Sequence, residues 1–143
     1  MQDANPEAAG SVRRLDMQAL AQLAAAHPPA AGRGSACATC AVLVCPGWES
    51  VPGSFDTSTL RRVGTLRDPG EAEPTLEEYH PRGTHGWSAD APIAPAFFPY
   101  NRCDVWQCPA CARAFLRYTE YGGYYQDERV RELSADLLDA SRP

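Results

Sequence analysis

The sequence predicts one domain of the α+β class, with a small antiparallel sheet and a helix near each end of the chain. Three observations indicate this class. Short β-branched or aromatic runs flank two cysteine clusters, amphipathic segments lie near both termini, and 13 prolines and 11 glycines among 143 residues disfavour long elements. Residues 1–10 are a polar, alanine-rich lead that we expect to be disordered, so the predicted domain covers residues 11–143.

The first element is a helix expected from Ser11 to about Ala26. Ser11 can cap its amino terminus, and His27-Pro28-Pro29 should end it, because proline cannot continue a helix. Its apolar residues recur at helical spacing: Val12, Leu15, Ala19 and Leu23. Residues 28–36 then form a linker.

Four short strands follow. We expect them at residues 41–45 (AVLVC), 60–67 (LRRVGTLR), 100–108 (YNRCDVWQC) and 113–121 (RAFLRYTEY), where β-branched and aromatic residues gather. The last two flank the turn CPAC and should form a hairpin. Residues 81–99 lack periodicity and are expected to be an ordered loop.

A second helix is expected at residues 127–140 (DERVRELSADLLDA). The Gly122-Gly123 pair breaks the chain before it. A narrow apolar stripe supports the helix: Val130, Leu133, Leu137 and Leu138.

All six cysteines lie in two clusters with mirrored spacing, C-x2-C-x4-C from Cys37 and C-x4-C-x2-C from Cys103. A CxxC turn supplies two thiolates to a tetrahedral metal ion, and backbone N–H groups in the turn offset their charge. Two such turns complete a four-cysteine site. The predicted ligands are Cys37, Cys40, Cys108 and Cys111, with one structural Zn²⁺ per chain.

The stretches VWQCPACARAFLRY and ACATCAVLV resemble the two halves of the zinc-ribbon (rubredoxin-like) class, in which each CxxC lies at the bend of a β-hairpin. The resemblance covers only the residues around the two clusters. It implies a zinc-ribbon-type antiparallel β core. The 67 proline-rich residues between Cys40 and Cys108 are a long insertion by the standards of that class. The resemblance implies metal binding and little about a substrate, because a shared fold does not fix a shared function.

Other uses of the thiols stay open. Iron in the same four-cysteine set is less favoured than zinc, since nothing marks a redox partner, and a [2Fe–2S] pattern lacks its fourth cysteine after Cys111. A thiol–disulfide function, a two-zinc cluster of six sulfurs and unliganded thiols are further alternatives. We expect Cys45 and Cys103 to be small buried residues. They could instead be neighbours on adjacent strands, and replacement of one of the four ligands by either of them is the least favoured option.

Composition argues against two partner classes. The formal net charge is −5, and all 13 basic residues are arginines with no run longer than two. The chain therefore lacks the cluster of basic residues that binds a phosphate backbone. The nucleic-acid alternative would need Arg102, Arg113 and Arg117 on one face of the ribbon hairpin. No apolar run has the length that spans a bilayer. We therefore expect a cytoplasmic protein without a membrane partner, from a GC-rich bacterial genome.

An enzyme is the less favoured function class. A metal-dependent hydrolase or transferase would use His80 and His85, with Asp90, Glu77 and Glu78 beside them. The favoured interpretation of this stretch is a surface loop whose histidines hydrogen-bond locally. No nucleotide-binding or catalytic signature motif occurs in the chain.

A protein partner is the favoured function class. Tyr118, Tyr121, Tyr124 and Tyr125 surround Gly122-Gly123, and tyrosines suit interfaces, although packing on the terminal helix is the alternative. The other aromatic residues are expected to build the core: Trp48, Trp87, Phe97, Phe98, Tyr100 and Trp106. The sequence thus predicts a small zinc-binding protein that acts as a protein-interaction or regulatory module.

Overall fold

A computed structural model describes residues 12–26 and 37–143. In these ranges the chain forms one α-helix and a five-stranded antiparallel sheet, so the α+β class is confirmed. The elements are α1 (Met17–Ala25), β1 (Glu49–Ser50), β2 (Arg61–Thr65), β3 (Asp104–Gln107), β4 (Ala114–Tyr121) and β5 (Gln126–Glu132). The expected disordered lead, the Ser11 cap and the 28–36 linker lie outside the described residues. No described helix has the length and apolar character needed to cross a membrane.

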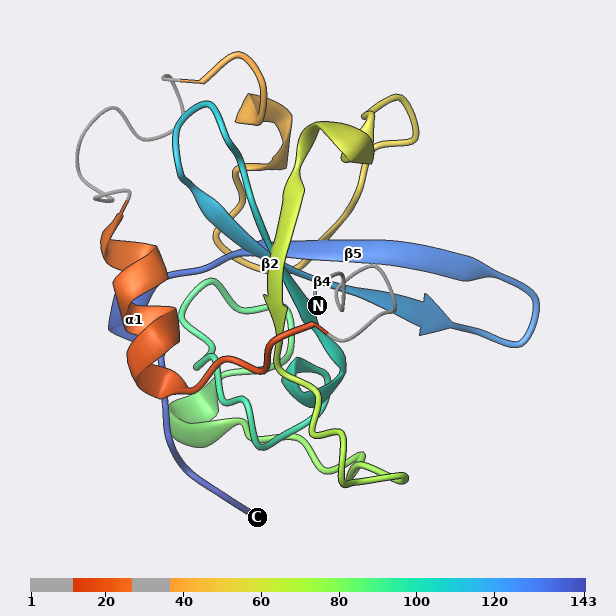
Figure 1. The fold of residues 1–143 in the computed structure, drawn as a ribbon. Helices are drawn as coiled ribbons and strands as arrows, with labels where there is room; N and C mark the ends of the chain where they lie inside the picture. The colour runs from red at the N-terminus through yellow and green to blue at the C-terminus, as the bar shows by residue number, and fades with distance from the viewer. Residues whose placement is uncertain (1–11, 27–36) are drawn as a thin grey trace, which may run out of the picture.

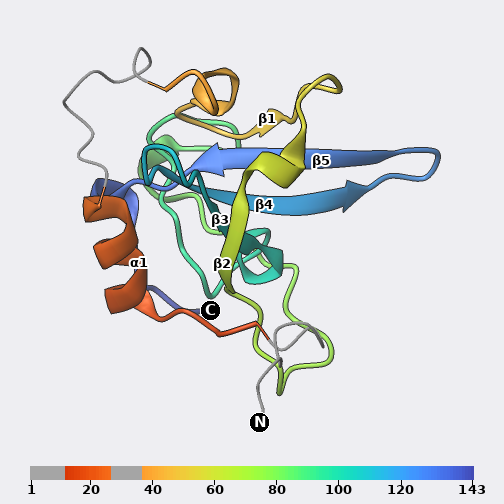
Figure 2. The ribbon, with the colours of Figure 1, turned by 45° about the horizontal axis from the view of Figure 1, so that its top comes forward.

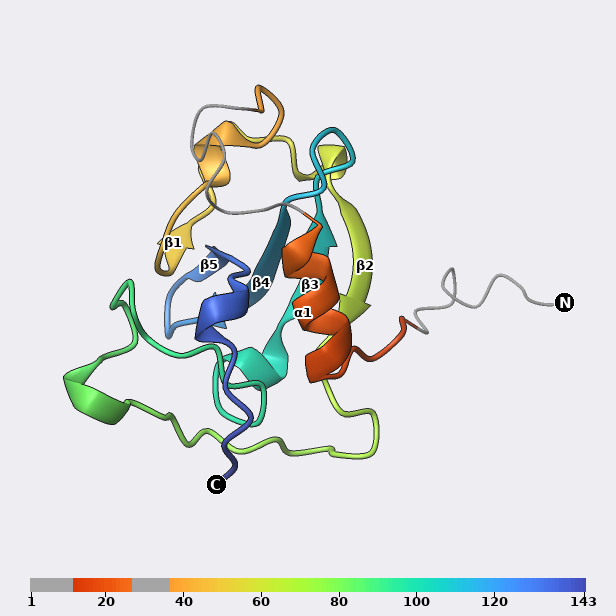
Figure 3. The same ribbon diagram turned by 90° about the vertical axis from the view of Figure 1, so that its left-hand side faces the viewer.

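The sheet has the order β1-β5-β4-β3-β2, which Figure 3 shows from left to right behind α1. β4 is the longest strand and lies at the centre, between β3 and β5. Figure 1 shows β4 and β5 running side by side. The predicted strand at 60–67 and the predicted hairpin around CPAC correspond to β2, β3 and β4. β1, only two residues long, was not predicted; it pairs with β5 through Glu49 and Val130.

The predicted carboxyl-terminal helix is wrong, because this segment forms β5 and then a 3₁₀ turn, Ala135–Leu137. β5 pairs with β4 from Glu132, which lies opposite Phe115, to Gln126, which lies opposite Tyr121. The turn that joins the two strands contains Gly122 and Gly123. Consecutive Val130 and Arg131 are both fully buried, on opposite faces of the sheet. The outer part of this hairpin extends beyond the other strands (Figure 2).

The helix α1 begins later than expected, after Asp16. The Asp16 carboxylate accepts a hydrogen bond from the Ala19 N–H over 2.8 Å, which caps the helix. Residues before it run extended beside β2: the Thr65 N–H donates to the Arg13 carbonyl and the Leu15 N–H to the Thr65 carbonyl, both over 3.0 Å. These backbone bonds hold residues 13–15 out of the helix.

Residues 41–45 do not form the expected strand. Ala41–Leu43 is a 3₁₀ turn, in which the Leu43 N–H donates to the Cys40 carbonyl over 2.9 Å. The Ala41 N–H donates to the Cys37 carbonyl over 3.0 Å. The local hydrogen bonds of the CxxC turn therefore override the β-branched composition of this stretch.

The sheet buries apolar side chains on both faces. One core contains residues from α1, β3, β4 and the loop before β3, including Leu20, Ile93, Val105 and Leu116. The other contains cysteines together with Leu43, Leu60, Phe115 and Val130. Phe115 and Leu116 are both 0% exposed although they are neighbours in sequence. β4 is thus shared by two cores.

The long segment between β2 and β3 is tied to the rest of the fold. Ile93 forms two backbone hydrogen bonds with the carboxyl-terminal segment. Its N–H donates to the Leu137 carbonyl over 2.7 Å, and its carbonyl accepts from the Asp139 N–H over 3.0 Å. The rings of Tyr79 and Phe97 stack with centroids 5.0 Å apart. Of the expected core aromatics, Trp48, Phe97 and Tyr100 are buried, Phe98 and Trp106 are partly buried and Trp87 is exposed.

Candidate metal centre

The second CxxC lies at the bend of the β3–β4 hairpin, where the zinc-ribbon resemblance places it. The Cys108 N–H donates to the Arg113 carbonyl over 2.9 Å, and the Ala112 N–H donates to the Cys108 carbonyl over 2.8 Å. Ala112 has φ of 72°, a left-handed conformation that closes the turn. The hairpin therefore fixes the direction of both cysteines.

The first CxxC does not lie at a hairpin bend. Cys37 and Cys40 belong to a turn that continues into the 3₁₀ turn Ala41–Leu43. The expected ribbon arrangement of two hairpins is thus found for one half of the site only. Leu43 is 1% exposed and packs in the same core as the cysteines, which anchors this turn over β4 and β5.

The structure brings the four predicted cysteines together. Their sulfur atoms all lie within 4.8 Å of one another. The Sγ atoms of Cys37 and Cys108 are 3.8 Å apart, and those of Cys40 and Cys111 are 3.6 Å apart, across 71 positions of sequence in each case. Because Zn–S bonds are about 2.3 Å long, tetrahedral coordination places sulfurs roughly 3.8 Å apart. The four sulfurs therefore have the spacing of a tetrahedral metal site and not that of disulfide bonds.

The surroundings of the four sulfurs favour the thiolate form at Cys37 but oppose it at Cys40 and Cys108. Backbone N–H groups of Cys40 and Thr39 lower the pKa of Cys37 from 9.0 to about 6, despite its burial. Burial raises the pKa of Cys40 and of Cys108. A bound divalent cation would supply the positive charge that the buried sulfurs need in order to lose their protons.

Arg113 places a buried cation beside the centre. Its side chain is almost fully buried and forms an ion pair with Glu132. Burial opposes its charge, but Glu132 and the sulfurs of Cys40 and Cys111 raise its pKa above the usual value. Arg113 can therefore offset part of the negative charge of a four-thiolate centre. The sequence gives no local sign of this pairing, which depends on β4 and β5 lying side by side.

Cys45 and Cys103 lie outside the group of four. The Cys45 Sγ donates to the Leu43 carbonyl over 3.1 Å, whereas the Cys103 Sγ donates to the Pro99 carbonyl over 3.4 Å. They belong to different cores, so they are not neighbours on adjacent strands. Burial raises the pKa of Cys45 to about 11 and that of Cys103 well above its usual value. Both behave as small buried residues, which was the favoured expectation.

The histidine loop does not assemble a second site in the described part of the chain. His80 Nε2 lies 2.8 Å from a Glu78 carboxylate oxygen, and His85 Nδ1 accepts a hydrogen bond from the Trp87 N–H over 3.3 Å. Neither histidine, nor Asp90 or Glu77, belongs to a group of three or more metal-ligating side chains. These contacts are local, as expected for a surface loop.

The three arginines of the nucleic-acid alternative are engaged with the protein. Arg113 is buried against Glu132. Arg117 lies over the Trp106 ring at 4.5 Å and 3.2 Å from Glu128. Arg102 lies over the Phe98 ring at 5.4 Å. They do not form an open basic face.

The four tyrosines of the predicted interaction surface separate into two groups. Tyr118 is buried and packs edge-on against Trp48, with ring centroids 5.0 Å apart. Tyr121, Tyr124 and Tyr125 lie around the tip of the β4–β5 hairpin and are 71%, 103% and 58% exposed. Only these three are available to another molecule.

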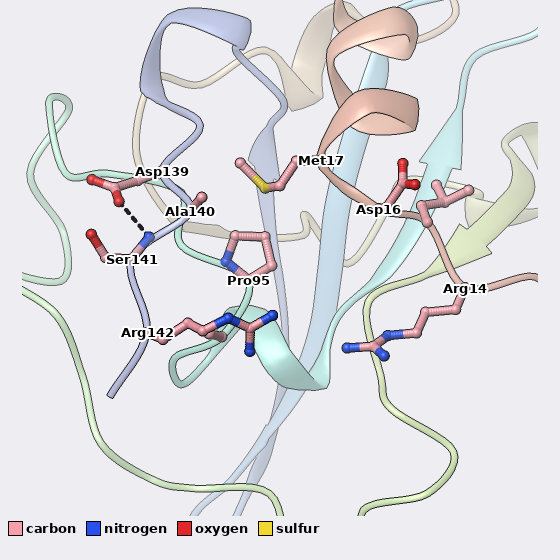
Figure 4. A pocket seen from close by; sticks show the side chains of 10 residues that line it. Arg14, Asp16, Met17, Pro95, Asp139, Ala140, Ser141 and Arg142 are labelled. Carbon is pink, nitrogen blue, oxygen red and sulfur yellow. Dashed lines mark hydrogen bonds between the residues drawn. The ribbon is translucent and has the colours of Figure 1, made fainter.

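A pocket of about 360 Å³ lies between the start of α1 and the carboxyl-terminal segment (Figure 4). The guanidinium groups of Arg14 and Arg142 point toward each other from opposite walls. Asp16 and Asp139 balance them in charge, and both carboxylates already accept hydrogen bonds from nearby backbone N–H groups. Nothing in this pocket has the arrangement of a catalytic or metal site.

No family model, curated protein or solved structure matches this chain.

Proposed function

We propose that this chain is a small zinc-stabilised protein of the bacterial cytoplasm that serves as a protein-interaction module. The observation that carries the proposal is the convergence of four cysteine sulfurs to within 4.8 Å. Two of them come from the β3–β4 hairpin and two from a turn far away in sequence. A metal ion bound there would crosslink both parts of the chain.

The donor set favours zinc. Four thiolates in a tetrahedron are a closed structural zinc site, with no position left for substrate. The centre is largely buried, so the ion would act on folding and not on a reacting molecule. Iron fits the same ligands, but the described residues contain no second group of metal-ligating side chains that could hold a redox partner for it.

The interaction role is supported by the hairpin tip. Tyr121, Tyr124 and Tyr125 expose large apolar surfaces next to hydroxyl groups, a combination that is common in protein interfaces. The same hairpin is continuous with the metal centre, since Ala114 at the start of β4 follows the CPAC turn. The metal would therefore support the strand that presents these tyrosines.

The metal proposal is tested on purified protein by zinc analysis, thiol counting and thermal unfolding. We expect one zinc per chain, no rapidly reacting thiol while the protein is folded with zinc bound, six reactive thiols after chelation and denaturation, and a large fall in melting temperature after chelation. Visible absorption would identify iron instead. Protein without stoichiometric metal, or with an unchanged melting temperature after stripping, would contradict the proposal.

The interaction proposal is tested with a triple variant, Tyr121→Ser, Tyr124→Ser and Tyr125→Ser. It should keep zinc content and melting temperature, because all three side chains are exposed. A partner recovered with the native chain, then purified and titrated against both proteins, should lose at least about tenfold in affinity. Equal affinity for the two proteins would remove the tyrosines from the interface.

A further inference from the structure

Within residues 12–26 and 37–143, the outer half of β4 has one backbone edge that no strand pairs with. β3 pairs with β4 only from Ala114 to Arg117. The Arg113 carbonyl accepts a hydrogen bond from the Cys108 N–H, so the backbone groups of Arg113 point toward β3. Because these groups alternate in direction along a strand, the N–H and carbonyl groups of the odd-numbered residues of β4 also point toward β3. Thr119 and Tyr121 direct theirs to the same side, past the end of β3. No described strand pairs with them there.

A groove of about 440 Å³ runs along this edge. Its lining comes from β4 and from three segments that precede it: Arg67, Leu76, Phe98, Arg102 and residues 118–121. Leu76 and Tyr121 are 68% and 71% exposed, so both present apolar surface to solvent. An extended chain placed on the edge would bring its alternate side chains against this surface.

The groove is locally positive although the chain is acidic. Arg67 and Arg102 are its two cations, and Glu120 is its one carboxylate. Glu120 accepts a hydrogen bond from the Tyr118 hydroxyl over 3.1 Å and lies 3.9 Å from Arg129, so it is already partly neutralised. Arg67 is 61% exposed, with a 3.7 Å contact to Asp104. Its guanidinium can therefore bind a further carboxylate at the groove.

We propose that the open edge of β4 binds an extended acidic peptide segment of a protein partner by strand addition. The peptide backbone would pair with Thr119 and Tyr121, its apolar side chains would contact Leu76 and Tyr121, and its carboxylates would meet Arg67 and Arg102. This inference rests on the proposed interaction role and names the partner chemistry, whereas it does not depend on which metal is bound.

A peptide fits these observations better than a nucleic acid. Unpaired backbone N–H and carbonyl groups match another strand, and a polyanion would meet a chain of net charge −5. A short acidic peptide carries far fewer charges than a nucleic acid, and the exposed guanidinium of Arg67 lies at the groove where it can pair with a peptide carboxylate.

The test uses the zinc-loaded full chain, labelled for NMR, and capped eight-residue peptides of alternating valine and glutamate. We expect chemical-shift changes at residues 118–121 and slower hydrogen exchange of the Thr119 and Tyr121 amides. A valine–lysine peptide should not bind. Arg67→Gln and Arg102→Gln should each weaken binding about fivefold. Arg61→Gln, an exposed arginine on β2, is the matched control and should change nothing.

Two further peptides separate strand addition from simple charge attraction. One peptide carries N-methyl groups on its odd-numbered residues and the other on its even-numbered residues, so each has one backbone edge that cannot donate hydrogen bonds. Strand addition predicts that one of them fails to bind while the other binds as the parent does. Equal behaviour of the two, equal binding of the lysine peptide, or tighter binding of a single-stranded oligonucleotide would overturn the proposal.

Zinc content and melting temperature are measured for every variant. If Arg102→Gln loses zinc, the decision rests on Arg67→Gln and the N-methylated pair. The chain could hold zinc and need its hairpin tyrosines for a partner, yet fail to bind the peptide. That result would remove only this inference. A chain without a metal that nevertheless binds the acidic peptide would remove only the zinc proposal.

Discussion

Arg131 donates a hydrogen bond from its guanidinium to the Ala91 carbonyl over 2.8 Å, joining β5 directly to the segment that precedes β3. The same side chain donates to the carbonyls of Pro46 and Ala89, over 3.1 and 3.2 Å, and to the Tyr100 hydroxyl. Arg131 is fully buried, and all four acceptors are neutral oxygens. One side chain therefore satisfies polar groups from three separate segments, and its contacts with the Ala91 carbonyl and the Tyr100 hydroxyl are fully buried.

Replacing Arg131 with Met should lower the free energy of unfolding by about 3 kcal/mol, because the buried acceptors lose their donor. Lys should also destabilise, since one ammonium cannot reproduce the planar fork. Urea denaturation of the zinc-loaded protein measures both changes. Values within about 0.5 kcal/mol of the native chain would show that water replaces the guanidinium without cost.

Substituting a metal ligand should affect stability far more than substituting either remaining cysteine. Cys40→Ser and Cys108→Ser should lose zinc and several kcal/mol of folding free energy, given that structural zinc binding is worth on the order of 10 kcal/mol. Cys45→Ala should keep one zinc per chain and cost about 1 kcal/mol, the usual effect of removing a small buried group. Zinc analysis and chemical denaturation compare them. Equal losses in the ligand variants and the control would contradict the assignment.

Gly64 is required by a close approach between β2 and Leu15. A Cβ atom at this position would lie 2.5 Å from the Leu15 Cγ, and Gly64 is buried. Gly64→Ala should therefore destabilise by about 1 to 3 kcal/mol through overpacking. The double variant with Leu15→Ala should cost less than the sum of the two single changes, because the clash is removed. Additive losses in denaturation would show that the clash is relieved elsewhere.

The tyrosines should divide sharply in their effect on stability. Tyr118→Ala should cost about 3 kcal/mol, since a buried ring that packs on Trp48 is lost. Tyr124→Ala should change the free energy of unfolding by less than about 0.5 kcal/mol, because its side chain is fully exposed. Thermal or urea unfolding of the two variants makes the comparison. A large loss at Tyr124 would mean that the hairpin tip packs against the protein.

Alkaline pH should weaken the fold through its buried thiols. Burial raises the pKa of Cys45 from 9.0 to about 11, so the folded chain keeps a proton that the unfolded chain releases. This contribution to stability is complete below pH 9 and declines as pH rises toward 11. Denaturation at a series of pH values should show a smaller decline for Cys45→Ala than for the native chain. Parallel pH curves would contradict the assignment.

The parts of the fold that the sequence predicts are those with a strong local signal. β2 and the β3–β4 hairpin follow from runs of β-branched and aromatic residues, with a CPAC turn inside the hairpin, and the cluster of four cysteines follows from two CxxC spacings. These patterns depend on turn geometry and on ligand chemistry, which act over a few residues.

The parts that were missed depend on contacts between distant segments. Val130, Leu133 and Leu137 have helical spacing, but β4 offers a full set of backbone partners, and pairing with it prevails. Gly122-Gly123 with tyrosines on both sides is a hairpin signal and could have identified the turn before β5. The Arg113–Glu132 pair and the groove at Arg67 have no local signal, because they exist only once the sheet is formed.

Phe115 and Leu116, adjacent on β4, belong to opposite cores of the sheet. Adding one residue to the turn between Cys108 and Cys111 would therefore do more than alter ligand spacing. It would slip the hairpin register and turn each of these side chains toward the wrong face. Both ligand spacing and strand register therefore fix the length of that turn, so natural variation in chain length is expected in the exposed stretch between residues 68 and 73 instead.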